Sequence, residues 1–249
     1  MTRTEPRRPL VSVMIPVYNG ERYLAEAVDS VLAQAYRPLE VIVVDDGSDD
    51  DSGVVAQRYG DPVRYVRQER AGNGAARNRA VALAAGDLFT FLDADDRLAP
   101  SALERLTEQL AEDPTLAAVY GHVREFVSPD VDAESLARLR PPVERVAGCL
   151  PTNMLMRREH FLRVGEFATH LRVGVTVDWS ARAAELSMRT ALLDDVLFER
   201  RLHADNNGIR EREHRTHYVQ VVKAALDRRR ALRLREEATA TGAAPEVDG

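Results

Sequence analysis

Short apolar runs alternate with stretches of helical periodicity four times over the first 113 residues. The run EVIVVDD at 40–46 is almost continuously apolar, which is typical of a strand buried on both faces. The stretch at 21–34 instead repeats its apolar residues along one helical face. This alternation predicts an α/β fold, in which helices cover both faces of a parallel sheet. The expected strands are 11–16, 40–46, 63–68 and 87–93, and the expected helices are 21–34, 52–59, 73–86 and 100–113.

The second half of the chain is less regular. Residues 116–127 alternate enough for one or two strands, and 128–148 carry three prolines around a short helical piece, which predicts a long surface excursion. A long arginine-rich helix is expected at 210–236 and a disordered tail at 237–249. Further expected elements are a helix at 157–167 that stops at Gly165, a helix at 178–186, and strands at 189–195 and 196–202.

Composition and charge exclude several classes of protein. The 249 residues are 45% apolar and 30% charged, as in ordinary globular proteins, and the net charge of −6 argues against a general nucleic-acid binder. The single cysteine, Cys149, has no internal disulfide partner and is expected to be a small buried residue. No signal peptide follows the basic start, and no segment approaches the ~20 apolar residues of a membrane span. We expect a soluble cytoplasmic protein.

Two acidic clusters follow predicted strands. Asp45 and Asp46 end one apolar run, and Asp93, Asp95 and Asp96 end another. Ligands of parallel α/β sheets bind beyond the carboxyl ends of the strands, so the fold should bring both clusters to one edge. Grouped carboxylates suit Mg²⁺ or Mn²⁺, which complete their coordination with water and substrate phosphates. A nucleoside diphosphate is therefore expected. The alternative is that these are turn and cap residues, which we favour for 49–51.

Other nucleotide and metal motifs do not fit. GNGAAR at 72–77 starts like a dinucleotide fingerprint but ends in arginine and does not follow the first strand. DDGSDDDSG at 45–53 lacks the spacing and the closing glutamate of a calcium loop. The chain has no Walker lysine motif, no G-x-S-x-G and no Cys-x-x-Cys.

The segments VSVMIPVYNGERYLAEAVDSVLAQ, EVIVVDDGSDD and GNGAARNRAVALAAGDLFTFLDADD together resemble the nucleotide-binding half of glycosyltransferase family 2. The resemblance is weaker through MLMRREHFLRVGEF, VDWSAR and RLHADNN. It implies the GT-A fold, with a mostly parallel sheet flanked by helices, and a transfer that inverts the anomeric centre. After an N-terminal tail at 1–9, residues 10–100 would bind the nucleotide sugar and 101–209 the acceptor. The helix at 210–236 and the tail at 237–249 lie outside the resemblance.

On the donor side, the resemblance implies specific roles for matched residues. Asp46 would accept a hydrogen bond from uracil or thymine, Asp93 would contact the ribose, and Asp95 would bind the metal with Asp96 in support. Further residues near the nucleotide would be Pro16 and Tyr18 around the base, together with Arg77 and Asn78. His203, in RLHADNN, would be a further metal or phosphate ligand, although a lone histidine is more often structural.

On the acceptor side, Asp178 matches the family's catalytic base. Relatives commonly have Glu-Asp where this chain has Val177-Asp178, so the acceptor pocket is expected to differ. The alternative for Asp178 is a helix N-terminal aspartate. Trp179 could stack on an acceptor ring or simply pack in the core.

The function expected from these residues is transfer of a sugar from a UDP- or dTDP-type donor, with Mn²⁺ or Mg²⁺, to an unidentified acceptor. That acceptor could be a glycan, a lipid carrier, a natural product or a peptide. The rival functions are a sugar-phosphate nucleotidyltransferase and a non-catalytic nucleotide-sugar-binding module. A nucleotidyltransferase usually needs a basic, glycine-rich phosphate loop near the N-terminus, and the sequence has no such loop there.

The arginine-rich helix at 210–236 leaves three alternatives open. It could pack on its own domain, form a homodimer through its Val219, Val222 and Leu226 side, or lie on anionic lipid. We favour packing or dimerisation over a peripheral membrane contact.

Overall fold

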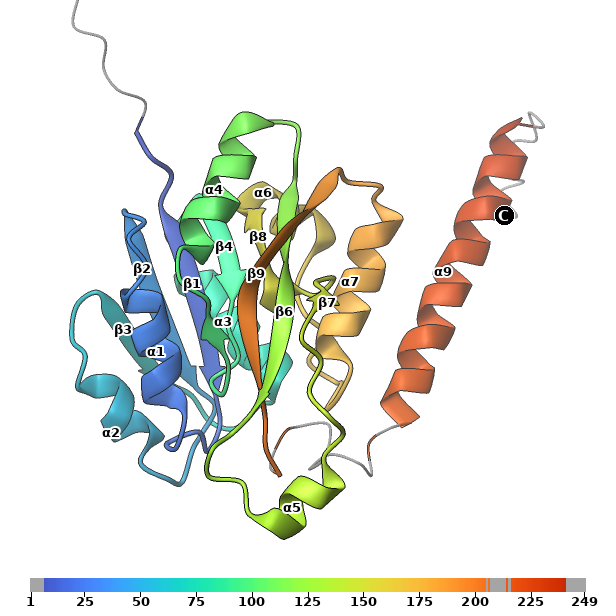
Figure 1. The fold of residues 1–249 in the computed structure, drawn as a ribbon. Coiled ribbons are helices and arrows are strands. Elements are labelled where there is room, and N and C mark those ends of the chain that lie inside the picture. The colour runs from blue at the N-terminus through green and yellow to red at the C-terminus, as the bar shows by residue number, and fades with distance from the viewer. Residues whose placement is uncertain (1–6, 205, 207–213, 215, 241–249) are drawn as a thin grey trace, which may run out of the picture.

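The computed structural model describes residues 7–204, 206, 214 and 216–240. Its centre is a nine-stranded sheet (Figure 1). The strands predicted in the first half pair in parallel, in the order β3-β2-β1-β4. Their bounds are β1 Val11–Val17, β2 Leu39–Asp45, β3 Val63–Arg67 and β4 Leu88–Phe91. The predicted parallel sheet is therefore confirmed for this half.

The second half of the sheet is mixed. β8 (Met154–Arg157) pairs antiparallel with β4 and with β6 (Ala118–Val127), and β6 pairs parallel with β9 (Thr190–Leu202). The two strands expected between 189 and 202 are one long strand, with an irregular register opposite Tyr120 to Val123. Two short strands, β5 (Arg97–Leu98) and β7 (Val146–Ala147), pair antiparallel with β9 and β6.

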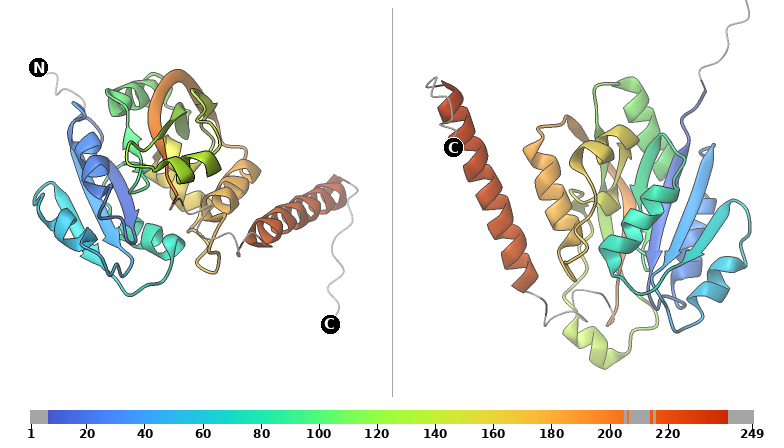
Figure 2. Two further views of the ribbon diagram at one scale, coloured as in Figure 1. Left: turned by 60° about the horizontal axis from the view of Figure 1, so that its bottom comes forward. Right: turned by 180° about the vertical axis from the view of Figure 1, so that it is seen from behind.

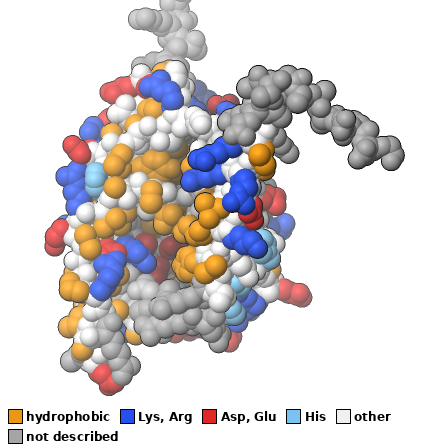
Figure 3. Space-filling model, turned by 90° about the vertical axis from the view of Figure 1, so that its right-hand side faces the viewer, with side chains coloured by type: hydrophobic (Ala, Val, Ile, Leu, Met, Phe, Trp, Pro, Cys, Tyr) orange, Lys and Arg blue, Asp and Glu red, His pale blue; other side chains and the backbone are white. Residues whose placement is uncertain are grey.

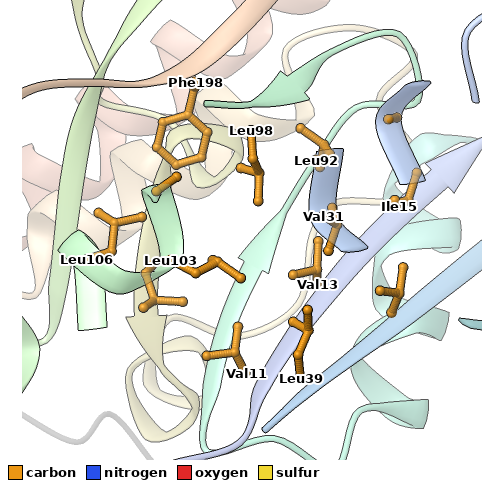
Figure 4. Close-up of a cluster of buried hydrophobic side chains, with 14 of the residues drawn as sticks. Val11, Val13, Ile15, Val31, Leu39, Leu92, Leu98, Leu103, Leu106 and Phe198 are labelled. Carbon is orange, nitrogen blue, oxygen red and sulfur yellow. The ribbon is translucent and has the colours of Figure 1, made fainter. Parts of the chain in front are cut away.

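Helices cover both faces of the sheet, as predicted (Figures 1 and 2). One face packs against α1 (Leu24–Leu32), α2 (Ser52–Gln57) and α4 (Ala102–Glu112). The other packs against α3 (Asn73–Leu83), α6 (Arg158–Val164) and α7 (Val175–Glu185). Strand residues alternate between the two layers. Val11, Val13 and Ile15 of β1 point into the layer drawn in Figure 4, and Met14 points into the other.

Local backbone chemistry shifts some expected helix ends. α3 ends at Leu83 and Ala84 is already extended, so Gly86 lies beyond the helix. A Cβ on Gly86 would lie 2.4 Å from the Ser12 hydroxyl oxygen, so close packing against β1 requires glycine there. α7 starts at Val175, three residues earlier than expected, after Gly174 with φ of 78°.

The excursion at 128–148 is tied to the sheet. It contains α5 (Ala133–Arg138) and β7, and the 3₁₀ turn Pro151–Asn153 follows it. Both terminal nitrogens of Arg140 donate to the buried carboxylate of Glu125 on β6, each at 2.6 Å. Cys149, expected to be buried, is exposed because it lies in the connection that leaves this excursion.

The C-terminal helix α9 (Thr216–Ala240) packs on its own domain, beside α7. Val221 is buried there, and Arg228 Nε lies 2.9 and 3.0 Å from the carboxylate oxygens of Glu185. Val219, Val222 and Leu226 do not pack on the domain, because they are 69%, 56% and 59% exposed; a homodimer through this side stays a prediction. Figure 3 shows the side of the molecule that carries this helix, with Lys and Arg side chains beside hydrophobic ones.

α9 also extends through 237–240, which were expected to be disordered; the rest of that tail, and the N-terminal tail at 1–6, lie outside the described residues. Among the described helices, none is both long and apolar enough to span a bilayer.

Candidate functional site

A cavity opens at the carboxyl ends of β1, β2 and β4. It receives side chains from the ends of these strands, from the start of α3 and from the segment after β9. The two acidic clusters predicted to converge both contribute to it, through Asp46 and through the turn at 93–96. The site residues expected from sequence that line it are Pro16, Tyr18, Asp46, Asp93, Asp95, Asp96 and His203.

Asp46 is buried and held by three hydrogen bonds. The main-chain N–H of Ala71 and the side-chain amide of Gln68 donate to its Oδ1, each at 2.8 Å, and the N–H of Gly72 donates to Oδ2 at 2.8 Å. An ionised carboxylate has about four lone-pair sites, so one acceptor position on Oδ2 remains. Asp46 can therefore accept a single further hydrogen bond from a ligand in the cavity.

The neighbouring Asp45 is structural. It is fully buried, accepts from the Ser48 N–H at 2.7 Å and accepts from the Tyr65 hydroxyl at 2.7 Å. Burial and this carboxylate raise the pKa of Tyr65 to about 12, so the hydroxyl stays protonated and keeps donating. Asp50 likewise accepts from the Ser52 N–H at 3.0 Å, which is the turn role expected for residues 49–51.

Tyr18 and Arg70 both line the cavity, and the guanidinium of Arg70 lies 3.9 Å from the centroid of the Tyr18 ring. Such a pair gives a flat, partly charged surface on which a planar group can stack. Tyr18 was expected from sequence and Arg70 was not, because arginine is common throughout this chain and Arg70 stands in no motif.

The turn at 93–96 concentrates negative charge. Burial is the largest influence on Asp93 and raises the pKa of its carboxyl, Arg77 opposes this, and Asp95 adds to it. Burial also raises the pKa of Asp96 well above its usual value, and the charges of Asp95 and Asp93 raise it further. Like charges held this close together favour either a proton or a cation. The turn is therefore electrostatically suited to a divalent ion.

His203 and Asn206 complete this end of the cavity. His203 Nε2 lies 2.9 Å from Asp95 Oδ2, and the Asn206 side-chain amide donates to the same oxygen at 3.2 Å. Neighbouring ligands of an octahedral ion with 2.0–2.1 Å bonds are about 3.0 Å apart, so Asp95 and His203 could share one Mg²⁺ or Mn²⁺. No cluster of three or more possible metal-binding side chains occurs among the described residues. The donor set fits an ion that takes most of its ligands from phosphate and water.

Arg77 and Asn78 do not line the cavity, and their hydrogen bonds go to other residues of the protein. Arg77 is buried, and its Nη2 donates to Asp93 at 2.5 Å. The Asn78 side chain exchanges two hydrogen bonds of 2.9 Å with the main chain of Phe167, which joins α3 to the segment before α7. Both residues were expected near the nucleotide; their contacts are to the protein.

Trp179 is a core residue. It is fully buried, its indole N–H donates to the Gly165 carbonyl at 2.9 Å, and its ring stacks on Phe161 at 5.7 Å. The acceptor-stacking alternative is therefore wrong, since no face of the ring is open to a ligand.

Asp178 lies on the first turn of α7 and does not line the cavity described above. Its carboxylate is 11% exposed, accepts from Arg182 Nε at 3.0 Å and lies 3.8 Å from Arg228 of α9. Val177 beside it is 38% exposed. The base role of Asp178 stays a prediction.

The cavity-lining residues missed from sequence include Arg70, Arg172, Arg200 and Asn206. Asn206 and the buried Arg201 both belong to RLHADNN, the motif from which only His203 was selected. This motif was the sequence signal that could have identified Asn206 and Arg201.

Comparisons with known sequences agree with this geometry. The profile of the family described as Glycosyl transferase family 2 matches residues 12–165. The chondroitin synthase of Pasteurella multocida is 34% identical over 237 residues, which cover 90% of this chain and 24% of that protein. An uncharacterized glycosyltransferase of Rickettsia typhi is 46% identical over 96 residues, 39% of this chain and 30% of that protein. The chain thus spans less than a third of either relative's length.

Solved structures share the fold. The mannosyltransferase PcManGT from Pyrobaculum calidifontis, in complex with GDP-Man and Mn²⁺, matches with a TM-score of 0.67 and 25% identity, covering 89% of this chain and 65% of that one. S. aureus TarS 1–349 in complex with UDP-GlcNAc matches with a TM-score of 0.65 and 19% identity, covering 79% and 60%. The predicted GT-A fold is confirmed.

Proposed function

The chain belongs to glycosyl transferase family 2, and we propose that it transfers a sugar, with inversion and with a divalent metal, from a nucleoside-diphosphate sugar to a nucleophilic acceptor. One observation carries the proposal. Asp46 and the turn at 93–96, 47 residues apart in the chain, open into one cavity. One end offers a hydrogen-bond acceptor for a base, and the other offers carboxylates for a cation beside a diphosphate.

The single free acceptor position of Asp46 favours a uracil or thymine base. These bases have one ring N–H to donate, whereas guanine presents two adjacent N–H groups that a carboxylate normally accepts together. Two of the three bonds that Asp46 already accepts come from main-chain N–H groups, which a side-chain rotation cannot release. A donor with a uracil or thymine base is therefore proposed over a guanine donor.

Asp95 and His203 are the residues proposed to hold Mn²⁺ or Mg²⁺, with Asp96 in support. Bound there, the ion would neutralise charge on the diphosphate as the sugar leaves. The Arg77 guanidinium donates to the Asp93 carboxylate and holds it in one orientation, in which Asp93 is proposed to contact the ribose. The wall formed by Tyr18 and Arg70 would hold the base, so that the diphosphate reaches the carboxylates.

Asp178 is proposed as the general base that accepts the proton of the attacking group. Arg182 and Arg228 lie 3.0 and 3.8 Å from its carboxylate and hold it in place, and its burial keeps water away. The exposed Val177 adds an apolar surface at the acceptor side. The acceptor class is a glycan, a lipid carrier, a natural product or a peptide.

A ligand panel tests the function. The melting temperature would be measured with UDP-, dTDP- and GDP-sugars, each with Mn²⁺ and with EDTA. We expect a UDP- or dTDP-sugar to raise it more with Mn²⁺ than with EDTA, because a ligand that binds the folded state stabilises it by mass action. Release of nucleoside diphosphate must accompany binding. Binding without any release would support a non-catalytic module, and pyrophosphate release from a nucleoside triphosphate and sugar phosphate would support a nucleotidyltransferase.

A further inference from the structure

Arg201, near the end of β9, is a buried cation in contact with the acidic turn. Its side chain is 2% exposed. The main-chain N–H of Arg201 donates to Asp96 Oδ1 at 2.9 Å, and its Nε donates to the main-chain carbonyl of Asp95 at 3.0 Å. The carbonyl of Arg201 accepts from Asn206, whose amide also donates to Asp95 Oδ2. One residue thus bonds to both carboxylate residues proposed at the metal.

The remaining contacts of the guanidinium fix it to α1, to the end of β6 and to Tyr23, which lines the cavity and lies beside His203 with ring centroids 4.8 Å apart. It donates to Ser128 at 3.1 Å and to Glu26 of α1 at 2.6 Å. The rings of Tyr23 and Phe126 lie 4.5 and 4.7 Å from its central carbon. These contacts hold the Arg201 side chain in one orientation. Its Nε bond then restrains the main-chain carbonyl of Asp95.

Stability alone does not account for this arrangement. Burying a guanidinium costs free energy that one partly exposed carboxylate, Glu26 at 48%, offsets only in part. Apolar residues of similar size often replace such pairs without loss of stability. A metal site, by contrast, depends on the groups that orient its ligands.

We propose that Arg201 is a positioning residue for the divalent metal: its side chain, through the Nε bond to the Asp95 carbonyl, fixes the turn so that it is ready for the ion before the donor arrives. The main-chain bond from Arg201 to Asp96 supports the same turn and is kept in side-chain variants. The inference rests on the proposed function, because it assumes that Asp95 and Asp96 face a metal. It concerns the affinity for metal and not the affinity for the base, which is bound at the other end of the cavity.

Arg97 supplies a matched control. Like Arg201, it lies over the Phe126 ring, at 4.2 Å, and donates to Glu26, at 3.3 Å. Its other ion pair is with Glu199, and none of its side-chain bonds goes to the turn at 93–96. Substituting either arginine removes an ion pair with Glu26 and packing on Phe126, but only Arg201 contacts the turn.

The experiment compares Arg201→Met with Arg97→Met in the full chain. Free Mn²⁺ is followed by electron paramagnetic resonance with UDP present, UDP binding is measured by calorimetry in EDTA, and the melting temperature is recorded. Outer-shell substitutions typically weaken metal binding by about 10–100-fold. We expect that loss in Arg201→Met, with metal-free UDP binding unchanged, and a less than twofold change in Arg97→Met.

Two outcomes would overturn the inference. One is equal Mn²⁺ affinity in Arg201→Met and wild type, whatever the melting temperature does; the other is equal weakening in the two arginine variants. If Arg201→Met does not fold, Arg201→Lys is compared with Arg97→Lys, because lysine keeps the charge near Glu26 but cannot span both Asp95 and Ser128. Wild-type protein that binds Mn²⁺ no better with UDP than without would instead contradict the proposed function.

Discussion

At the scale of single residues, the site separates groups that touch a ligand from groups that hold them. Asp46, Asp95 and His203 line the cavity, whereas Arg77, Asn78 and Trp179 bond to the protein around it. The sequence motifs contain both kinds of residue. Asp178 is the residue for which this distinction matters most, since it has a catalytic role by resemblance and two arginine partners in the structure.

Replacing Asp178 by Asn tests its role as the base. The amide keeps the shape but cannot take a proton, so turnover should fall by about 10²–10⁴-fold while donor binding stays the same. The rate is measured as release of nucleoside diphosphate at saturating donor. Glu185→Gln is the control, because Glu185 also pairs with Arg228 from α7. Similar, near-normal rates in both variants would leave Asp178 with a purely structural role.

At the scale of elements, Glu125 is one of the groups that hold the excursion at 128–148 to the sheet. This buried carboxylate accepts two bonds from Arg140 and one, at 3.1 Å, from the Val143 N–H. Burial alone would raise the pKa of Glu125, but its bonds with Arg140 and Val143 lower it overall. Arg200, which lines the cavity, is 3.5 Å from the same carboxylate, so one side chain links the excursion to the site.

Glu125→Gln should loosen this excursion. The amide cannot accept both Arg140 bonds, and the loss of a charge-assisted pair should lower stability by about 1–3 kcal/mol. Limited proteolysis should then cut faster within 128–148, and hydrogen exchange should rise there while the core strands stay protected. Glu144→Gln, at an exposed position of the same excursion, is the control. Equal cutting in the two variants would show that Glu125 does not anchor the excursion.

At the scale of the whole molecule, the sheet is covered by two separate apolar layers, and one of them buries a histidine. His160 of α6 is 3% exposed and lies edge-on to Trp179, with ring centroids 6.3 Å apart. Burial and the nearby Arg163 lower the pKa of His160 to about 4. The folded protein therefore prefers the neutral ring, while the unfolded chain takes up a proton near the ordinary pKa of about 6.5.

This histidine should make folding sensitive to acid. Because the pKa of His160 is lower in the folded protein than in the unfolded chain, its full contribution to the free energy of unfolding is present above about pH 6.5. That contribution is lost as the pH falls toward 4. Between pH 7 and 5 the expected loss is about 2 kcal/mol at ~1.4 kcal/mol per pKa unit. Urea unfolding of His160→Gln should show a correspondingly flatter profile than wild type, whereas the exposed His170→Gln should match wild type. Parallel profiles for all three proteins would contradict the assignment.

The sequence by itself determined the first half of the molecule, because the signals there are local. Near-continuous apolar strands and one-sided helices repeat within a few residues, and parallel strands must end at the same edge of a sheet. The convergence of Asp46 with Asp93, Asp95 and Asp96 follows from that rule and could be predicted before the fold was seen.

Only the tertiary structure decided what joins these acids. β9 pairs with β5 and β6. This pairing places Arg201, His203 and Asn206 beside the turn at 93–96, which lies about 110 residues earlier in the chain. Such pairing depends on long-range register, which leaves no periodic trace in the sequence. The burial of Trp179, the exposure of Cys149 and the ion pairs of Asp178 have the same origin, since each depends on which elements pack together.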